Sequence, residues 1–185
     1  MGERTKDVLA EGLRQLLEEK LLDRITVREL TGKCHMGRNT FYYHFRDIYE
    51  LMDWMFIGEA EKIINGLDDK DDWQRGMTQA MNYIFENKNV IYNIYNSINK
   101  QKIENYLYDV MQGIIFGFVT RQTGDNDIPV EYKKKIADFF RYALVGWVFQ
   151  WMENGMKETP EKVVSDLDGL LDGVLEKILG NAKRK

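Results

Sequence analysis

The chain has 185 residues, of which 44% are hydrophobic and 30% are charged, and its formal net charge at pH 7 is −4. This apolar content suffices for the core of one large domain or two small ones, so it excludes a chain that is disordered throughout. The single cysteine, Cys34, excludes an internal disulfide and favours a reducing, cytoplasmic compartment.

The spacing of apolar residues predicts an all-α fold. Apolar positions recur at intervals of three and four, and only two prolines occur in the chain. We therefore expect about nine helices and no strand. The first helix, residues 3–20, carries an apolar stripe on one face, made of Leu9, Leu13, Leu16 and Leu17.

Two short helices joined by a tight turn are predicted between residues 24 and 46. Thr26 and Glu29 have the spacing of a capping box, in which the threonine hydroxyl accepts from the backbone of Glu29 and the glutamate bonds back. Residues 32–37 supply a turn, and a second amphipathic helix follows over residues 38–45. This is the plan of a helix-turn-helix, whose second helix lies in the major groove of DNA.

The same segment concentrates positive charge. Residues 24–46 hold five basic side chains and one acid, a local charge of +4, so the rest of the chain carries −8. A polyanion is thus attracted to this segment and repelled elsewhere. Leu30, Cys34, Met36, Phe41 and Phe45 are predicted to form its small apolar interior.

The residues left for the outside of this segment suit DNA. Arginine can bond guanine, asparagine can bond adenine, and hydroxyl, phenol and imidazole groups can bond phosphates. The alternative is a charged helix whose tyrosines pack by chance. The candidate contacts are Arg28, Arg38, Asn39, Thr40, Tyr42, Tyr43 and His44.

Six further helices are predicted after this segment. A second capping-box pattern, Asp47 to Glu50, opens a long helix, and the break before the last helix combines Asn154-Gly155 with a cap and first turn at Thr159-Pro160. We expect a DNA-binding domain over residues 1–47 and a helical regulatory and dimerisation domain over residues 48–185. The predicted helices cover residues 47–65, 73–87, 88–98, 101–122, 130–154 and 161–179.

Two of these helices have apolar stripes broader than one neighbour requires, which predicts a dimer with a four-helix interface. The alternative is that both stripes belong to an intramolecular core. The longest apolar stretch, residues 139–152, is interrupted by polar side chains and is shorter than the roughly 20 residues of a membrane span. The predicted interface residues are Phe140, Leu144, Trp147, Trp151, Leu167, Leu170, Leu171 and Val174.

Residues 73–119 are rich in aromatic side chains and methionine, a composition that suits either a small-molecule cavity or a plain core. The candidate pocket residues are Trp73, Met77, Met81, Tyr92, Tyr95, Tyr106, Met111 and Phe116.

No catalytic constellation is recognisable. The only histidines are His35 and His44, and the chain contains no P-loop, dinucleotide fingerprint or nucleophile elbow. Cys34 with these histidines lacks the ligand spacing of a zinc site. We therefore expect no enzyme activity, no cofactor and no metal.

The sequence resembles the DNA-binding signature of the TetR family of bacterial regulators at residues 26–30 (TVREL), 40–45 (TFYYHF) and 50–51 (EL). The resemblance implies an all-α homodimer that binds a palindromic operator and usually has an effector pocket. It also implies that Arg28, Arg38 and Asn39 approach bases. Phosphates would be held by Thr26, Thr40, Tyr42, Tyr43 and His44.

Three positions depart from the family pattern. His35 replaces a turn glycine, Gly37 replaces a capping serine, and Ile48 replaces a phosphate-binding lysine. Glycine can still cap a helix, and histidine tolerates a left-handed turn position better than most residues do. The loss of the lysine predicts weaker nonspecific affinity.

Residues 147–160 also resemble the corresponding segment of dihydroxyacetone-kinase-type regulators within that family. The predicted function is a sequence-specific DNA-binding regulator, most simply a ligand-controlled repressor. The alternatives are a TetR-like activator and a helical adaptor that binds a partner protein and has lost ligand control or DNA binding.

Overall fold

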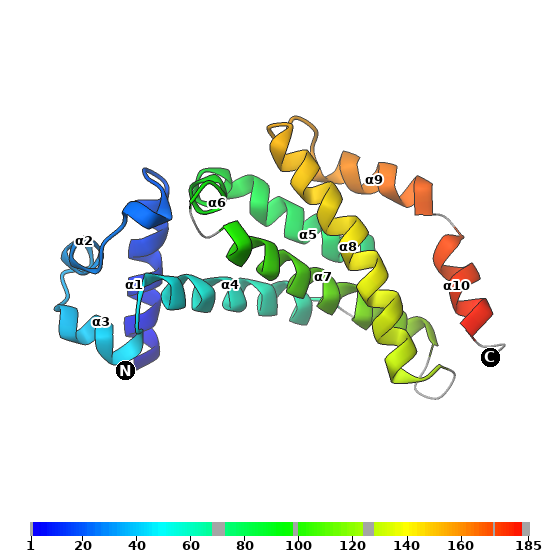
Figure 1. Ribbon diagram of the computed structural model, residues 1–185, viewed down its shortest axis with the longest axis horizontal. Coiled ribbons are helices and arrows are strands. Elements are labelled where there is room, and N and C mark those ends of the chain that lie inside the picture. Colours follow the sequence, from blue (N-terminus) through cyan, green and yellow to red (C-terminus); the bar gives the residue numbers. More distant parts are fainter. Residues whose placement is uncertain (1, 68–72, 98–99, 124–127, 172, 183–185) are drawn as a thin grey trace. The chain divides into compact units, whose positions relative to one another are not determined.

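The computed structural model describes residues 2–67, 73–97, 100–123, 128–171 and 173–182. Every regular element in these ranges is helical (Figure 1), which confirms the predicted fold class. The elements are α1 (Gly2–Leu17), a 3-10 turn η1 (Leu22–Arg24), α2 (Val27–Lys33), α3 (Arg38–His44), α4 (Ile48–Asn65), α5 (Trp73–Glu86), α6 (Lys88–Tyr95), α7 (Lys100–Thr123), α8 (Val130–Glu153), α9 (Pro160–Leu171) and α10 (Val174–Ala182).

The C-terminal region contains two helices where one was predicted over residues 161–179. α9 ends at Leu171 and α10 begins at Val174. Gly173, between them, has φ +68°, a left-handed conformation that ends an α-helix and that glycine adopts without a Cβ penalty. None of the helices in the described ranges combines the length and apolar character needed to cross a bilayer.

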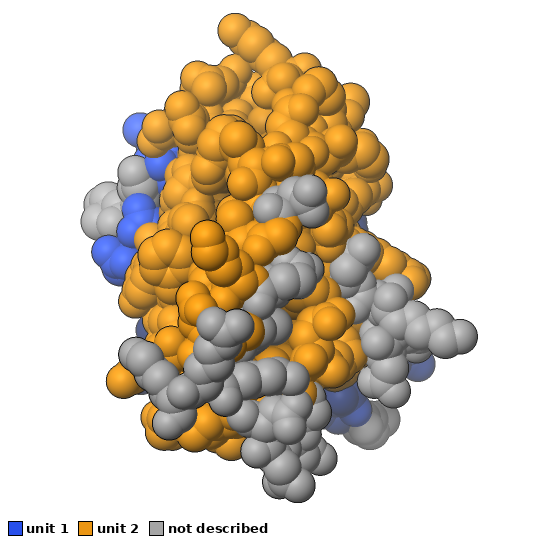
Figure 2. Space-filling view, turned by 90° about the vertical axis from the view of Figure 1, so that its right-hand side faces the viewer, with its two compact units in different colours: residues 1–61, 87–106 blue, residues 62–86, 107–185 orange. Residues whose placement is uncertain are grey.

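The chain divides into two compact units, which Figure 2 distinguishes by colour. Unit 1 comprises residues 1–61 and 87–106, and unit 2 comprises residues 62–86 and 107–185. This division differs from the predicted boundary after residue 47, because the first part of α4 and all of α6 pack with the N-terminal helices. The functional boundary at residue 47 stays a prediction.

Unit 1 is built around α1. The four leucines of its predicted stripe are all buried. Asn93 Nδ2 on α6 donates to the carbonyl oxygen of Leu17 at 2.8 Å, which satisfies one of the acceptors left free at the end of α1. Arg14 Nη1 donates to Asn87 Oδ1 at 2.9 Å, and its Nη2 lies 3.5 Å from Glu59 Oε1. These polar contacts fix α6 against α1 despite their separation in sequence.

Unit 2 contains the pair α5 and α9, linked by hydrogen bonds from Gln74 to Asp168 (2.6 Å) and from Asn82 to Glu161 (3.1 Å). The predicted break before α9 is confirmed. Gly155 has φ +80°, α9 begins at Pro160, and Lys162 N donates to Thr159 Oγ1 at 3.3 Å.

Candidate nucleic-acid interface

The first helix of the predicted helix-turn-helix is capped as expected. The hydroxyl of Thr26 accepts the backbone N–H of Glu29 at 3.2 Å, which satisfies one of the free donors at the start of α2. The second half of the predicted box differs, because the Glu29 carboxylate accepts from Lys20 Nζ. α2 is therefore tied both to its own cap and to the segment that follows α1.

The turn between α2 and α3 has the hydrogen bonds of a Schellman motif. Met36 N donates to Thr31 O at 2.9 Å and His35 N donates to Gly32 O at 3.2 Å. His35 has φ +52°, which confirms the left-handed position predicted for it. Gly37 is the N-cap of α3, as predicted, and as a glycine it supplies no side-chain capping bond. The substitutions of the usual turn residues by His35 and Gly37 thus leave the backbone geometry of the turn between α2 and α3 intact.

The interior of this segment is aromatic and aliphatic. Leu30, Phe41 and Phe45 are buried, and the predicted Cys34 and Met36 are half-buried. Lys6 on α1 places its Nζ 5.6 Å from the ring centroid of Phe45, a distance typical of cation–π contacts. α3 is thereby held on its inner side by α1 as well as by α2.

The outer side of the segment carries the predicted DNA contacts. The side chain of Tyr43 is 85% exposed and that of Tyr42 is 56% exposed, although both belong to a helix whose Phe41 is fully buried. His44 is half-buried, and its ring meets the ring of Tyr43 edge to face at 4.9 Å. The remaining predicted contacts are all exposed: Thr26, Arg28, Arg38, Asn39 and Thr40.

The corner between α3 and α4 adds a further cation. Arg46 is 84% exposed and its Nε lies 3.3 Å from Asp47 Oδ2. Asp47 caps α4 by accepting from Glu50 N at 2.9 Å, and Glu50 accepts the Arg46 N–H at 2.6 Å. Burial raises the pKa of Asp47, but hydrogen bonds from Glu50 and Arg46 outweigh burial and leave its pKa below the ordinary value. Ile48 is buried, so the residue at this position of the resemblance forms part of the core.

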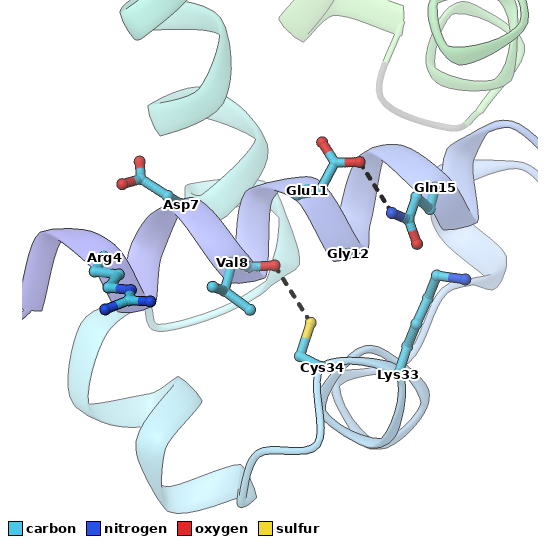
Figure 3. Close-up of a pocket in the computed structure, with 8 residues that line it drawn as sticks. All are labelled: Arg4, Asp7, Val8, Glu11, Gly12, Gln15, Lys33 and Cys34. Carbon is cyan, nitrogen blue, oxygen red and sulfur yellow. Dashed lines mark hydrogen bonds between the residues drawn. The ribbon is translucent and has the colours of Figure 1, made fainter.

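A close contact that the sequence did not reveal positions α2 on α1. A Cβ added to Gly12 would lie 2.3 Å from Cys34 Sγ, so only glycine permits this approach. Cys34 Sγ donates to the Val8 carbonyl oxygen at 3.4 Å. Burial raises the pKa of the Cys34 thiol, with Lys33 acting in the opposite sense. The contact borders a surface groove of about 320 Å³ between α1 and α2 (Figure 3).

Comparison with known proteins identifies the family. Residues 71–173, more than half of the chain, match the TetR C-terminal family model described as "Transcriptional regulator C-terminal region". The chain belongs to the TetR family. The expectation drawn from the N-terminal resemblance is confirmed by a match that lies outside the helix-turn-helix.

Individual relatives agree with this assignment. A segment of 84 residues is 26% identical to the dhaKLM operon transcriptional activator DhaS of Lactococcus lactis, and the match spans 45% of this chain and 45% of that relative. A solved structure named dihydroxyacetone kinase operon activator DhaS has a TM-score of 0.70 and 20% identity, with 97% of this chain and 96% of that one covered. A TetR regulator from Streptococcus agalactiae has a TM-score of 0.63 and 17% identity, over 98% and 94% of the two chains.

The predicted effector-pocket residues of this TetR-family chain fall into both units. Trp73, Met77, Met81 and Met111 are buried in unit 2, where Phe116 is half-buried. The half-buried residues Tyr92, Tyr95 and Tyr106 belong to unit 1, and the Tyr106 ring lies 4.5 Å from that of Phe56. Burial raises the pKa of Tyr92. An effector pocket among these residues stays a prediction.

The predicted interface residues divide by exposure. Phe140, Leu144, Trp151 and Leu167 are buried within the single chain. Trp147, Leu170 and Val174 are exposed, and Leu171 is half-buried. The exposed members, together with Phe139 and Tyr142, leave an apolar surface on the C-terminal helices that a second chain can reach.

Proposed function

We propose that this TetR-family chain is a sequence-specific DNA-binding regulator and that α3 is its recognition helix. The observation that carries this proposal is the exposure of Tyr43 and Tyr42 beside Arg38 and Asn39, on a helix that is anchored from behind by a fully buried Phe41. Large aromatic groups exposed among hydrogen-bond donors are typical of a binding surface rather than a solvated one. The local charge of +4 gives that surface the sign that a phosphate backbone requires.

The chemistry of the exposed side chains assigns their roles. Arg38 and Asn39 stand at the start of α3, the part of a recognition helix that meets base edges, and Arg28 can approach bases from α2. Hydroxyl, phenol and imidazole groups then serve as phosphate contacts: Thr26, Thr40, Tyr42, Tyr43 and His44.

The exposed apolar surface of the C-terminal helices supports a homodimer, which places two recognition helices on one palindromic operator. Control by an effector requires that the ligand favour one arrangement of the dimer over another, because equal affinity for both shifts nothing. We infer that the buried aromatic and methionine side chains of the candidate pocket serve this purpose.

The relatives bear most directly on whether this chain represses or activates transcription. A repressor is the simplest expectation from the resemblance. The similarity to a relative and a solved structure that are both named as the activator DhaS favours activation as the second candidate. A reporter gene placed beside the selected operator separates the two, because deletion of the regulator raises expression for a repressor and lowers it for an activator.

The test of DNA binding starts from a pool of random duplexes. The bound fraction is sequenced, and the binding of the enriched duplex is measured across salt concentrations. Recovery of a palindrome whose half-sites lie about one or two helical turns apart, with affinity that falls steeply with salt, is the expected result. No enrichment, with binding to a protein partner instead, would favour a helical adaptor.

A further inference from the structure

One face of α8 is exposed along almost its whole length. Phe139 is 65% exposed, Tyr142 is 56% exposed and Trp147 is 41% exposed. Between them lie two small residues, and a Cβ added to Gly146 would meet no atom within 4 Å. An exposed apolar row of this size is unusual for a surface that faces water alone. The exposed residues of this α8 face, which has polar groups at its ends, are Lys135, Phe139, Tyr142, Ala143, Gly146, Trp147, Gln150 and Asn154.

The two ends of this α8 face differ in charge. Lys135, near the start of the helix, is exposed and has no ion-pair partner among the described residues. Its neighbour Lys134 is already paired with Glu131 at 3.1 Å. Lys135 is the sixth residue of α8 and lies beyond the first turn, where the helix dipole acts, so its own helix dipole gives it no stabilisation.

The far end of the face opens into a groove between the end of α8 and the start of α9. Its volume is about 150 Å³, below the range of roughly 300–1,000 Å³ typical of small-ligand pockets, so it suits one inserted side chain. The groove is lined by Trp147, Gln150, Trp151, Asn154, Glu158, Val163 and Asp166.

The walls of this α8–α9 groove are suited to a cation. Trp151 Nε1 donates to the Glu158 carbonyl oxygen at 2.9 Å, which fixes the loop that forms one wall. Asp166 is paired with Lys162, and Lys162 also interacts electrostatically with Glu158, so two carboxylates in this region are served by one lysine. The exposed ring of Trp147 offers a π face. An exposed tryptophan beside an excess of carboxylate over lysine is a favourable site for an ammonium group.

We propose that Lys135 of a second copy of this chain occupies the groove, in an antiparallel pair of α8 helices. The small residues Ala143 and Gly146 allow the two backbones their closest approach, so the symmetry axis passes between these positions. Residues equally distant from that point then face each other: Tyr142 faces Trp147, Phe139 faces Gln150, and Lys135 faces Asn154 on the rim of the groove. The lysine also lies beside the negative end of the partner helix.

This inference rests on the homodimer proposed above and adds its register and its charge contact. The test measures the dimer dissociation constant by sedimentation for the wild type, Lys135→Glu, Glu158→Lys and the double variant. Each single charge reversal occurs twice in a symmetric dimer, and we expect it to weaken the dimer by about tenfold or more. The double variant exchanges the two charges and is expected to return to within about threefold of the wild type.

Lys134→Glu is the matched control, because it makes the same charge change one residue away and off the α8 face. It should leave the dissociation constant nearly unchanged, and circular dichroism should show equal helicity for all variants. A monomeric wild type would refute the homodimer itself. If the wild type is a dimer, three results would each overturn the groove contact while leaving the homodimer in place. The single variants could dimerise as tightly as the wild type, the double variant could fail to regain wild-type affinity, or Lys134→Glu could weaken the dimer as much as Lys135→Glu does.

Discussion

The α3 surface and the α8 face both expose large aromatic side chains, but they differ in what surrounds them. On α3, Tyr42 and Tyr43 stand among arginine, asparagine and threonine side chains, and the helix-turn-helix segment has a net charge of +4. On α8, Phe139 and Trp147 flank small residues, and the charges are separated, with a lysine at one end and a carboxylate at the other. Exposure alone therefore does not identify the partner. A net positive charge with hydrogen-bond donors fits a polyanion, whereas an apolar row with opposite charges at its two ends fits a second copy of the same row.

The largest expected effect separates base reading from phosphate binding on α3. Arg38→Ala should lower the affinity for the selected operator by about 1–3 kcal/mol and relax the base preference at one position of each half-site. Tyr43→Ala should weaken binding to all sequences alike. Both are measured as binding isotherms on the operator and on single-base variants. Neither should alter the dimer dissociation constant, and unchanged isotherms for both variants would refute the assignment of α3.

The next effect concerns the support of α3 rather than its surface. Gly12→Ala forces a Cβ against Cys34 Sγ, and overpacking of this kind costs about 1–3 kcal/mol, partly offset by about 1 kcal/mol of better helix propensity. We expect a net loss of stability in thermal or urea unfolding. In a Cys34→Ala background the contact with the sulfur is absent and only the milder contact with Leu30 Cδ1 at 3.2 Å is left, so the same substitution should cost less. A loss of equal size in both backgrounds would show that the sulfur contact is unimportant.

A smaller effect tests the α8 face. Phe139→Ser removes the most exposed ring of that face and should weaken the dimer by about tenfold while leaving the unfolding of the monomer nearly unchanged. Phe140→Ser is the neighbouring control, because Phe140 is buried and its loss should reduce stability by about 3–5 kcal/mol. Equal destabilisation by both variants would place Phe139 in the core of the chain instead.

The smallest effect is a pH dependence at the corner after α3. Asp47→Asn keeps a capping group but removes the charge that pairs with Arg46. Because the pKa of Asp47 lies below its ordinary value of 3.8, its charge stabilises the fold above that pH, and this contribution is lost as the pH falls through the lowered pKa. The difference in unfolding free energy between wild type and variant should be present at neutral pH and vanish in acid. A difference independent of pH would assign it to geometry rather than charge.

The sequence alone determined the features that depend on nearby residues. The helix periodicity, the Thr26 cap, the left-handed turn at His35 and the break at Gly155 and Pro160 all involve contacts within a few positions along the chain, and each was predicted correctly. The exposed set on α3 was equally readable, since the alternation of buried and outward residues follows from helix geometry. The division between α9 and α10 at Gly173 could not be predicted from the sequence, because a single glycine is also tolerated inside a helix.

Tertiary structure decided what depends on distant residues. Gly12 carries no signal of its own until Cys34 is placed against it. α6 joins unit 1 because Asn87 accepts a hydrogen bond from Arg14 of α1 and Asn93 donates one to Leu17 of α1. The same holds for the broad stripes of α8 and α9, where packing within the chain buried Phe140 and Leu167 and left Phe139 and Trp147 outside. The physical reason is that periodicity shows which face of a helix is apolar. Only the folded arrangement determines whether that face is covered by the same chain or is left for a second one.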